Sequence, residues 1–238
     1  MSKETIAIVF GGRSSEHEIS CLSAGGVLSA IDRNKYEVVL IGITKEGNWV
    51  LVPETQQLSI KDGKLPEVPS SAPGVVADVA GFSVGGKPLN VDLIFPTLHG
   101  PYGEDGTIQG VLEMVGIKYV GSGVLASAVC MDKSYAKPIF ASAGLKIAAG
   151  TVVTSTKFDL PSNLTYPLFV KPARSGSSRG TTKVKQESEL KSAVEFALSF
   201  DTKVIIEQAV VGREIECAVL QADGKTIVSD VGQIVIAD

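Results

Sequence analysis

Apolar residues recur in short unbroken runs near the start of the chain. These runs occupy residues 5–10, 37–43 and 91–95, and the first is rich in β-branched side chains. A continuous apolar run of this length is typical of a strand buried on both faces, as in a parallel sheet. A helix is predicted between the first two runs, over about residues 16–30. Strands that alternate with helices predict an α/β unit.

The pattern changes further along the chain. A helical pattern over residues 108–115 ends at Gly116, and a second helix is predicted over 132–143, with Asp132 placed to cap it. One more helix is predicted over residues 187–200. Strands are predicted at residues 151–153, 168–170, 203–207, 214–221 and 231–236. This order of elements is α+β, and the stretch 44–88 before it is predicted to form a hairpin and long loops.

These changes predict three domains. Their limits are residues 1–121, 122–207 and 208–238. The strand predicted at 231–236 has no visible partner, so we expect the third domain to be incomplete.

Composition narrows the partners that the protein is expected to have. The 238 residues are 44% hydrophobic, with 22 basic and 26 acidic side chains, a net charge of −4 and no run of like charges. We therefore expect a small-molecule partner rather than nucleic acid or an anionic membrane. Three widely spaced cysteines without a C-x-x-C pair indicate reduced thiols. No apolar stretch approaches the ~18 residues of a membrane span, so we expect a soluble, cytoplasmic protein.

The loop from His99 to Gly110 (HGPYGEDGTIQG) carries the densest group of polar and glycine residues. It follows the third predicted strand, at the edge where open parallel sheets bind ligands. Glycines here would let the backbone approach a ligand, with His99, Glu104 and Asp105 as its polar groups. A tight turn with Asp105 capping the next helix explains the same residues, and the spacing leaves both interpretations open.

A second group follows the strand predicted at 168–170. The segment KPARSGSSRG begins at Lys171 and is small and flexible, as are loops that cradle phosphates. It is not a Walker P-loop, and no G-x-G-x-x-G follows the first strand. A third group, Glu207 to Glu214, begins at the end of a buried strand; taken alone, its acids are ordinary strand-end residues.

Together these motifs resemble the D-alanine–D-alanine ligases. The resemblance rests on H-G-x-x-G-E-D-G-x-x-Q-G at 99–110, G-S-G at 121–123, M-D-K at 131–133, and the turn GGRSSEHEIS at 11–20. The segment K-P-x-x-x-G-S-S-x-G at 171–180 is similar to the phosphate-covering loop of ATP-grasp enzymes in this family. The resemblance implies a parallel-sheet α/β domain that precedes an α+β ATP-grasp domain. It also implies ATP-dependent ligation of two D-alanines through an acyl phosphate, for peptidoglycan precursors.

By this resemblance, Glu16 meets the ammonium group of the first D-alanine and hydrogen-bonds to Ser177, and His99 contacts the substrate carboxylate. Glu16 and Ser177 would be the catalytic residues. The structural alternative is that Glu16 or Glu18 only interacts with the dipole at the helix N-terminus, which stabilises the helix by about 0.3–1 kcal/mol. His17 is expected to be a surface or capping residue.

The resemblance also assigns the nucleotide contacts. Lys171 would contact the α and β phosphates with Lys133 as a second lysine, and Ser177 and Ser178 would cover the γ-phosphate. Phosphoryl transfer depends mainly on positioning and charge neutralisation, which two lysines supply. Alone, Lys133 would be an ordinary exposed helix lysine.

At the base and ribose, the resemblance implies four further contacts: Glu207 to the adenine amino group, backbone groups of Gln208 and Val210 to the ring, and Glu214 to the ribose. Two residues depart from the family's loop. Ser175 replaces an acid or glycine, and Arg179 replaces a β-branched apolar residue. The effect of the two departures stays open.

The sequence supplies no metal residues. Glu104–Asp105 and Glu214/Glu216 lack a converging third ligand, although the resemblance implies Mg²⁺ with ATP. We expect the magnesium ligands in a part of such ligases that lies beyond Asp238, and we therefore expect this chain alone to be inactive. The resemblance also implies a homodimer.

Two alternatives remain at this stage. One is a D-alanine–D-lactate or D-alanine–D-serine ligase, because the residues that choose the second substrate fall outside this chain. The other is a non-catalytic nucleotide-binding module, if the 238 residues are the native form.

Overall fold

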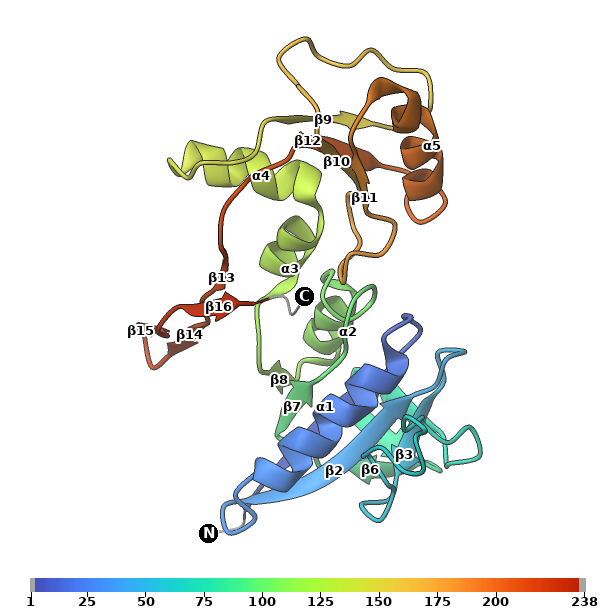
Figure 1. The fold of residues 1–238 in the computed structure, drawn as a ribbon. Coiled ribbons are helices and arrows are strands. Elements are labelled where there is room, and N and C mark those ends of the chain that lie inside the picture. The colour runs from blue at the N-terminus through green and yellow to red at the C-terminus, as the bar shows by residue number, and fades with distance from the viewer. Residues whose placement is uncertain (1–2, 236–238) are drawn as a thin grey trace.

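A computed structural model describes residues 3–235, with one sheet at each end and helices between them (Figure 1). The first sheet has the order β3-β2-β1-β7-β8. Its strands are β1 (Glu4–Gly11), β2 (Tyr36–Ile43), β3 (Trp49–Val52), β7 (Leu93–Pro96) and β8 (Lys118–Tyr119). All neighbours are parallel except β3, which runs antiparallel to β2. The predicted parallel sheet is confirmed, and its third strand begins at Leu93, two residues later than predicted.

Both faces of β1 are buried, which explains its unbroken apolar run. Ile8 and Phe10 pack on one face against α1 (His17–Ala30). Ala7 and Val9 pack on the other face, in a cluster that includes Leu112 of α2 (Thr107–Val115). Alternate residues of a strand point to opposite faces, so only a doubly covered strand requires apolar residues at every position.

The segment between β2 and β7 forms antiparallel structure. β3 makes a hairpin with β2, and β4 (Val75–Asp78), β5 (Gly81–Val84) and β6 (Lys87–Leu89) form a three-stranded sheet. Phe82 of this small sheet stacks on Trp49 with ring centroids 5.9 Å apart. The predicted hairpin is present, and the stacked rings attach the insertion to the first sheet.

Two helices connect the sheets: α3 (Val124–Met131) and α4 (Lys133–Ser142). Asp132 caps α4, since its Oδ1 accepts a hydrogen bond of 2.9 Å from Ser134 N, as predicted. α3 was not predicted. Its N-cap is Gly123, which has no side chain to mark a helix start.

The second sheet is antiparallel, with the order β11-β10-β12-β9. Its strands are β9 (Gly150–Val153), β10 (Leu168–Pro172), β11 (Thr182–Val184) and β12 (Val204–Gln208). Helix α5 (Glu187–Leu198) packs on the face that carries Val204 and Ile206. Ile205 and Glu207 alternate with these residues and therefore point to the opposite face, where α4 lies. The α+β order is confirmed, although β11 was not predicted.

The last part of the chain differs from the prediction. The strand predicted over 214–221 is two strands, β13 (Glu214–Glu216) and β14 (Val219–Ala222), which pair with β16 (Gly232–Ile234) and β15 (Lys225–Val228). The expectation that 231–236 has no partner was wrong for its described residues; residue 236 lies outside them. Strand pairing is a choice among distant segments, and alternation along one strand does not encode it.

Within residues 3–235, no helix has the length and apolar character needed to cross a membrane. The predicted domain limits at 121 and 207 stay a prediction.

Candidate functional site

The turn after β1 places Glu16 at the carboxyl edge of the first sheet. Gly11 and Gly12 have φ angles of 86° and 93°, a region that side chains disfavour. A Cβ at Gly11 would also lie 2.4 Å from the carbonyl oxygen of Ile43. A Cβ at Gly100 would lie 2.8 Å from Glu16 Oε2, so the carboxylate lies directly against the loop after β7. The two motifs therefore meet at one edge of the sheet.

His99 lies in this edge beside α1. Ser14 Oγ donates a 2.7 Å hydrogen bond to the carbonyl oxygen of His99, and His99 Nε2 lies 2.8 Å from Ser23 Oγ. The backbone N–H of Gly100 donates to Glu104 Oε2 at 2.9 Å. The structure thus brings His99 close to Glu16 and uses Glu104 to hold their common loop.

Asp105 serves the turn in this loop. Its carboxylate accepts hydrogen bonds from the backbone N–H groups of Tyr102 and Thr107, at 2.9 and 3.0 Å. Thr107 is the first residue of α2. Asp105 therefore holds a tight turn at the start of a helix, which is the turn interpretation given for it from the sequence.

The expectation for His17 was wrong, because this residue is buried and only 1% exposed. Val68 N donates to its Nε2 at 3.1 Å, and its Nδ1 lies 2.8 Å from the carbonyl oxygen of Gly12. Since Nε2 accepts, Nδ1 carries the proton and donates to Gly12. His17 thereby joins the turn of Glu16 to the insertion, through a partner that sequence spacing could not reveal.

The loop after β10 reaches from the second sheet to the first. Ser177 and Ser178 adopt positive φ angles of 49° and 54°. Ser177 Oγ donates a 2.6 Å hydrogen bond to Glu16 Oε1. The hydrogen bond that the resemblance implies is present, and it connects the two groups of predicted site residues.

Lysines gather behind this loop. Lys133 Nζ donates to the carbonyl oxygen of Ser175 at 2.7 Å, so α4 holds the loop by its backbone. Burial, followed by the nearby ammonium of Lys171, lowers the pKa of Lys133. Lys171 itself forms an ion pair with Glu207 across neighbouring strands.

The loop and the second sheet enclose a cleft of about 420 Å³. Seven of the residues predicted to contact the nucleotide line it: Lys133, Lys171, Ser177, Ser178, Glu207, Gln208 and Val210. The side chain of Gln208 is bound to Thr165, with Nε2 donating to Thr165 O at 2.7 Å, and the N–H of Gln208 donates to Ala149 O at 2.8 Å. Glu214 lies apart from the cleft, exposed on β13.

The chain matches two family models, described as D-ala D-ala ligase N-terminus over residues 5–122 and D-ala D-ala ligase C-terminus over residues 139–238. The chain belongs to the D-alanine–D-alanine ligase family. It is 49% identical to the D-alanine–D-alanine ligase of Mycolicibacterium smegmatis, over 98% of this chain and 67% of the relative. It is 48% identical to that of Paenarthrobacter aurescens, over 92% of this chain and 63% of the relative. The chain thus spans about two thirds of the length of these relatives.

Solved structures of the family have the same fold. The VanG D-Ala:D-Ser ligase from Enterococcus faecalis matches 98% of this chain, and 70% of its own, with a TM-score of 0.86 and 39% identity. The D-alanine–D-alanine ligase from Coxiella burnetii matches 98% of this chain, and 71% of its own, with a TM-score of 0.83 and 31% identity.

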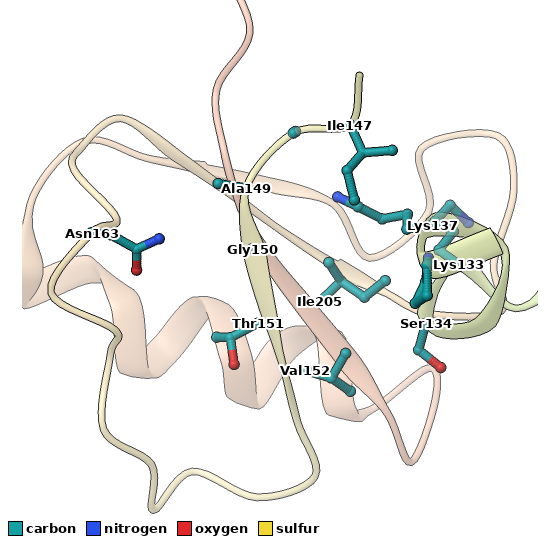
Figure 2. Close-up of a pocket in the computed structure, with 12 residues that line it drawn as sticks. Lys133, Ser134, Lys137, Ile147, Ala149, Gly150, Thr151, Val152, Asn163 and Ile205 are labelled. Carbon is teal, nitrogen blue, oxygen red and sulfur yellow. The ribbon is translucent and has the colours of Figure 1, made fainter. Parts of the chain in front are cut away.

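Sequence reasoning missed one lysine of the ligase cleft region. Lys137 Nζ lies 2.5 Å from Glu207 Oε2, so this carboxylate has two lysine partners. Figure 2 shows Lys137 extending from α4 toward the strands, in a hollow of about 350 Å³ beside the cleft. Apolar side chains of Ile147, Val152 and Ile205 line the same hollow. The available signal was its position four residues after Lys133, on the same face of a helix.

The two departures from the family loop take separate roles. The guanidinium of Arg179 lies over the ring of Phe200, 5.8 Å from the centroid, in a cation–π contact. Ser175 contributes its carbonyl to Lys133. Among residues 3–235, no group of three or more His, Cys, Asp or Glu side chains could hold a metal ion.

Proposed function

We propose that the complete protein joins two D-alanines into D-alanyl-D-alanine, with ATP as the phosphoryl donor and an acyl phosphate as intermediate, for peptidoglycan precursors. The observation that carries this proposal is the 2.6 Å hydrogen bond from Ser177 to Glu16. It brings the residue proposed to orient the first D-alanine next to the residue proposed to cover the γ-phosphate. An acyl phosphate requires this proximity, because a carboxylate oxygen must attack the γ-phosphorus.

At the first-substrate end, Glu16 accepts from the ammonium group of D-alanine and His99 contacts its carboxylate. Support comes from the common edge on which the two residues lie, held by Ser14 and Ser23. A substrate fixed at both its charged ends presents one carboxylate oxygen to the phosphate loop. Closure of the Ser177 loop over this point excludes water, which would otherwise hydrolyse the acyl phosphate.

At the nucleotide end, Lys133 and Lys171 neutralise phosphate charge, and Ser177 with the backbone of Ser178 covers the γ-phosphate. Support comes from the 420 Å³ cleft that these four residues line. Glu207 and the backbone of Gln208 and Val210 receive the adenine, and Glu214 receives the ribose. Glu214 is exposed on β13, so its contact requires the paired strands β13 and β16 to approach the cleft.

Residues 3–235 bring no three acidic, His or Cys groups together that could by themselves hold a metal ion, and we propose that the magnesium ligands lie in the remaining part of the complete protein. We therefore assign no metal ligand in residues 3–235 and derive no step through a metal. The domain limits 1–121, 122–207 and 208–238 are proposed with the function. A homodimeric state and a cytoplasmic location are supported by the family resemblance.

A second candidate is ligation of D-alanine to D-serine, and the match to the VanG D-Ala:D-Ser ligase favours it. Phosphate release from ATP by the full-length protein separates the two. Release with D-alanine alone, with D-alanyl-D-alanine as product, is the expected result. Release that requires D-serine or D-lactate would instead show that one of these is the second substrate. No release with any of these substrates would refute the ligase function.

A further inference from the structure

Glu207 is held between lysines from two different elements. Lys137 of α4 lies 2.5 Å from Oε2, and Lys171 of β10 pairs with Oε1. The side chain of Glu207 is only 13% exposed and that of Lys137 only 19%. Burial by itself would raise the pKa of Glu207, but hydrogen bonds from Lys137 and Lys171 outweigh it and lower this pKa. The carboxylate therefore depends on its lysine partners to remain charged.

The cluster has more positive than negative charge. Lys137 and Lys171 both pair with the Glu207 carboxylate, and the ammonium of Lys171 is close enough to Lys133 to help lower the pKa of Lys133, after burial. A polyphosphate that enters the cleft attracts the ammonium groups that face it. Lys171 faces the cleft, so its ion pair with Glu207 is the one that a polyphosphate would draw away.

Lys137 is placed differently from Lys171. It lines the apolar hollow next to the cleft, where Figure 2 shows it reaching from α4 toward the strands. Lys133, Lys171 and the loop of Ser177 are among the residues that line the cleft, whereas Lys137 is not. Lys137 can therefore stay with Glu207 while Lys171 turns to the phosphates. Without it, a carboxylate that is nearly buried would lose its remaining cation.

We propose that Lys137 is a positioning residue that holds the Glu207 carboxylate in place for the 6-amino group of the nucleotide base when Lys171 engages the phosphates. This inference rests on the proposed function, because it takes an adenine nucleotide as the ligand of the cleft. Lys137 would set the preference for a 6-amino purine through Glu207, without itself contacting the nucleotide. An unpaired carboxylate would rotate away or take up a proton, and its hydrogen bond from the base would then be lost or weakened.

The test compares ATP with purine riboside triphosphate, which lacks the 6-amino group, in full-length wild type and Lys137→Met. Dissociation constants come from calorimetry, and KM and kcat come from phosphate release. In Lys137→Met we expect ATP to bind about tenfold more weakly, as for loss of a hydrogen bond to a charged group, while purine riboside triphosphate changes little. The KM for ATP should rise more than kcat falls. Lys137→Arg, which keeps the charge, should retain the wild-type preference.

The matched control is Lys191→Met, which removes an exposed lysine from α5 on the opposite face of the sheet. Thermal unfolding establishes that each variant is folded, and Lys137→Gln replaces Lys137→Met if the latter is not. An unchanged preference for ATP, or an equal loss for both nucleotides, would overturn the proposal. A wild type without any preference would overturn it too. D-alanine-dependent phosphate release in the same samples reports separately on the ligase function.

Discussion

Ser177 and Glu16 are 161 residues apart in the chain, and a 2.6 Å hydrogen bond joins the hydroxyl of one to the carboxylate of the other. Ser177 belongs to the loop after β10 of the second sheet, and Glu16 to the turn after β1 of the first. A hydroxyl that donates to a carboxylate makes a short, charge-assisted bond, stronger than a neutral one. This contact therefore helps to position the loop of Ser177, proposed to cover the phosphates, next to Glu16, proposed to bind the first substrate.

Replacing Ser177 with alanine should open this contact. We expect D-alanine-dependent phosphate release by the full-length protein to fall by a factor of about 10–100, since the loop no longer lies over the reacting centre. Hydrogen exchange of the loop amides should become faster. Ser15→Ala, which alters an exposed serine of the same turn as Glu16, should change neither quantity. Full activity in Ser177→Ala would show that the contact has no part in catalysis.

Replacing Gly100 with alanine should displace the Glu16 carboxylate. Gly100 has a φ of 69°, and its added Cβ would lie 2.8 Å from Glu16 Oε2. We expect the KM for the first D-alanine to rise about tenfold, with a smaller change in the KM for ATP. The control is Gly110→Ala in α2, where an added Cβ meets no atom within 4 Å. This variant should gain about 0.5–1 kcal/mol of stability at unchanged KM. An unchanged D-alanine KM in Gly100→Ala would argue against the assigned position of Glu16.

His17→Leu should destabilise the protein more than His99→Leu does. The first change leaves Gly12 O and Val68 N without their buried partner, at a cost of about 3 kcal/mol in the free energy of unfolding. The second removes one contact, to Ser23, at a partly buried position. Urea unfolding measures both. His99→Leu should instead raise the KM for D-alanine. Equal stability of the two variants would contradict the structural role assigned to His17.

The ion pair of Asp132 with Lys203 predicts a pH dependence of stability. Burial by itself would raise the pKa of Asp132, but hydrogen bonds from Lys203 and Ser134 hold it below the ordinary 3.8. A lowered pKa contributes stability that is present above about pH 4 and is lost as the pH falls through the folded-state value. Asp132→Asn should therefore be less stable than wild type at pH 7, and this difference should shrink as the pH falls below about 4.

Thermal unfolding between pH 7 and pH 2 measures this difference. Asp159→Asn, at an exposed site, should follow the wild type over the whole range. A gap between Asp132→Asn and wild type that persists undiminished at pH 2 would assign the loss to packing rather than to charge.

Local signals in the sequence were sufficient for much of the fold. The apolar run of β1 is explained by burial of both its faces, and the end of α2 at Gly116 by a φ of 77° that glycine adopts readily. Asp132 caps α4 through its own side chain. The two helix-end signals act within a few residues, so their outcome does not depend on the rest of the chain, whereas the run of β1 anticipates helices that cover it from both sides.

The motifs of the candidate site were also readable, since each is a contiguous segment. Sequence spacing and the family resemblance together predicted the gathering of the turn of Glu16, the loop of His99 and the loop of Ser177. Lys137 was missed because its one local signal, a position four residues after Lys133, does not separate it from an exposed helix lysine. Its importance comes from Glu207, which lies 70 residues away in the chain.

By itself, the sequence determined where most of the buried strands and helices lie, and it marked the segments that we propose carry phosphate-loop and substrate chemistry. Only the tertiary structure decided that His17 is buried, that residues 214–221 divide between two strand pairs, and that Glu207 has two lysine partners. The physical reason is the same in all three. Burial, strand pairing and ion pairing are relations between distant segments, and their free energy exists only once the chain has brought those segments together.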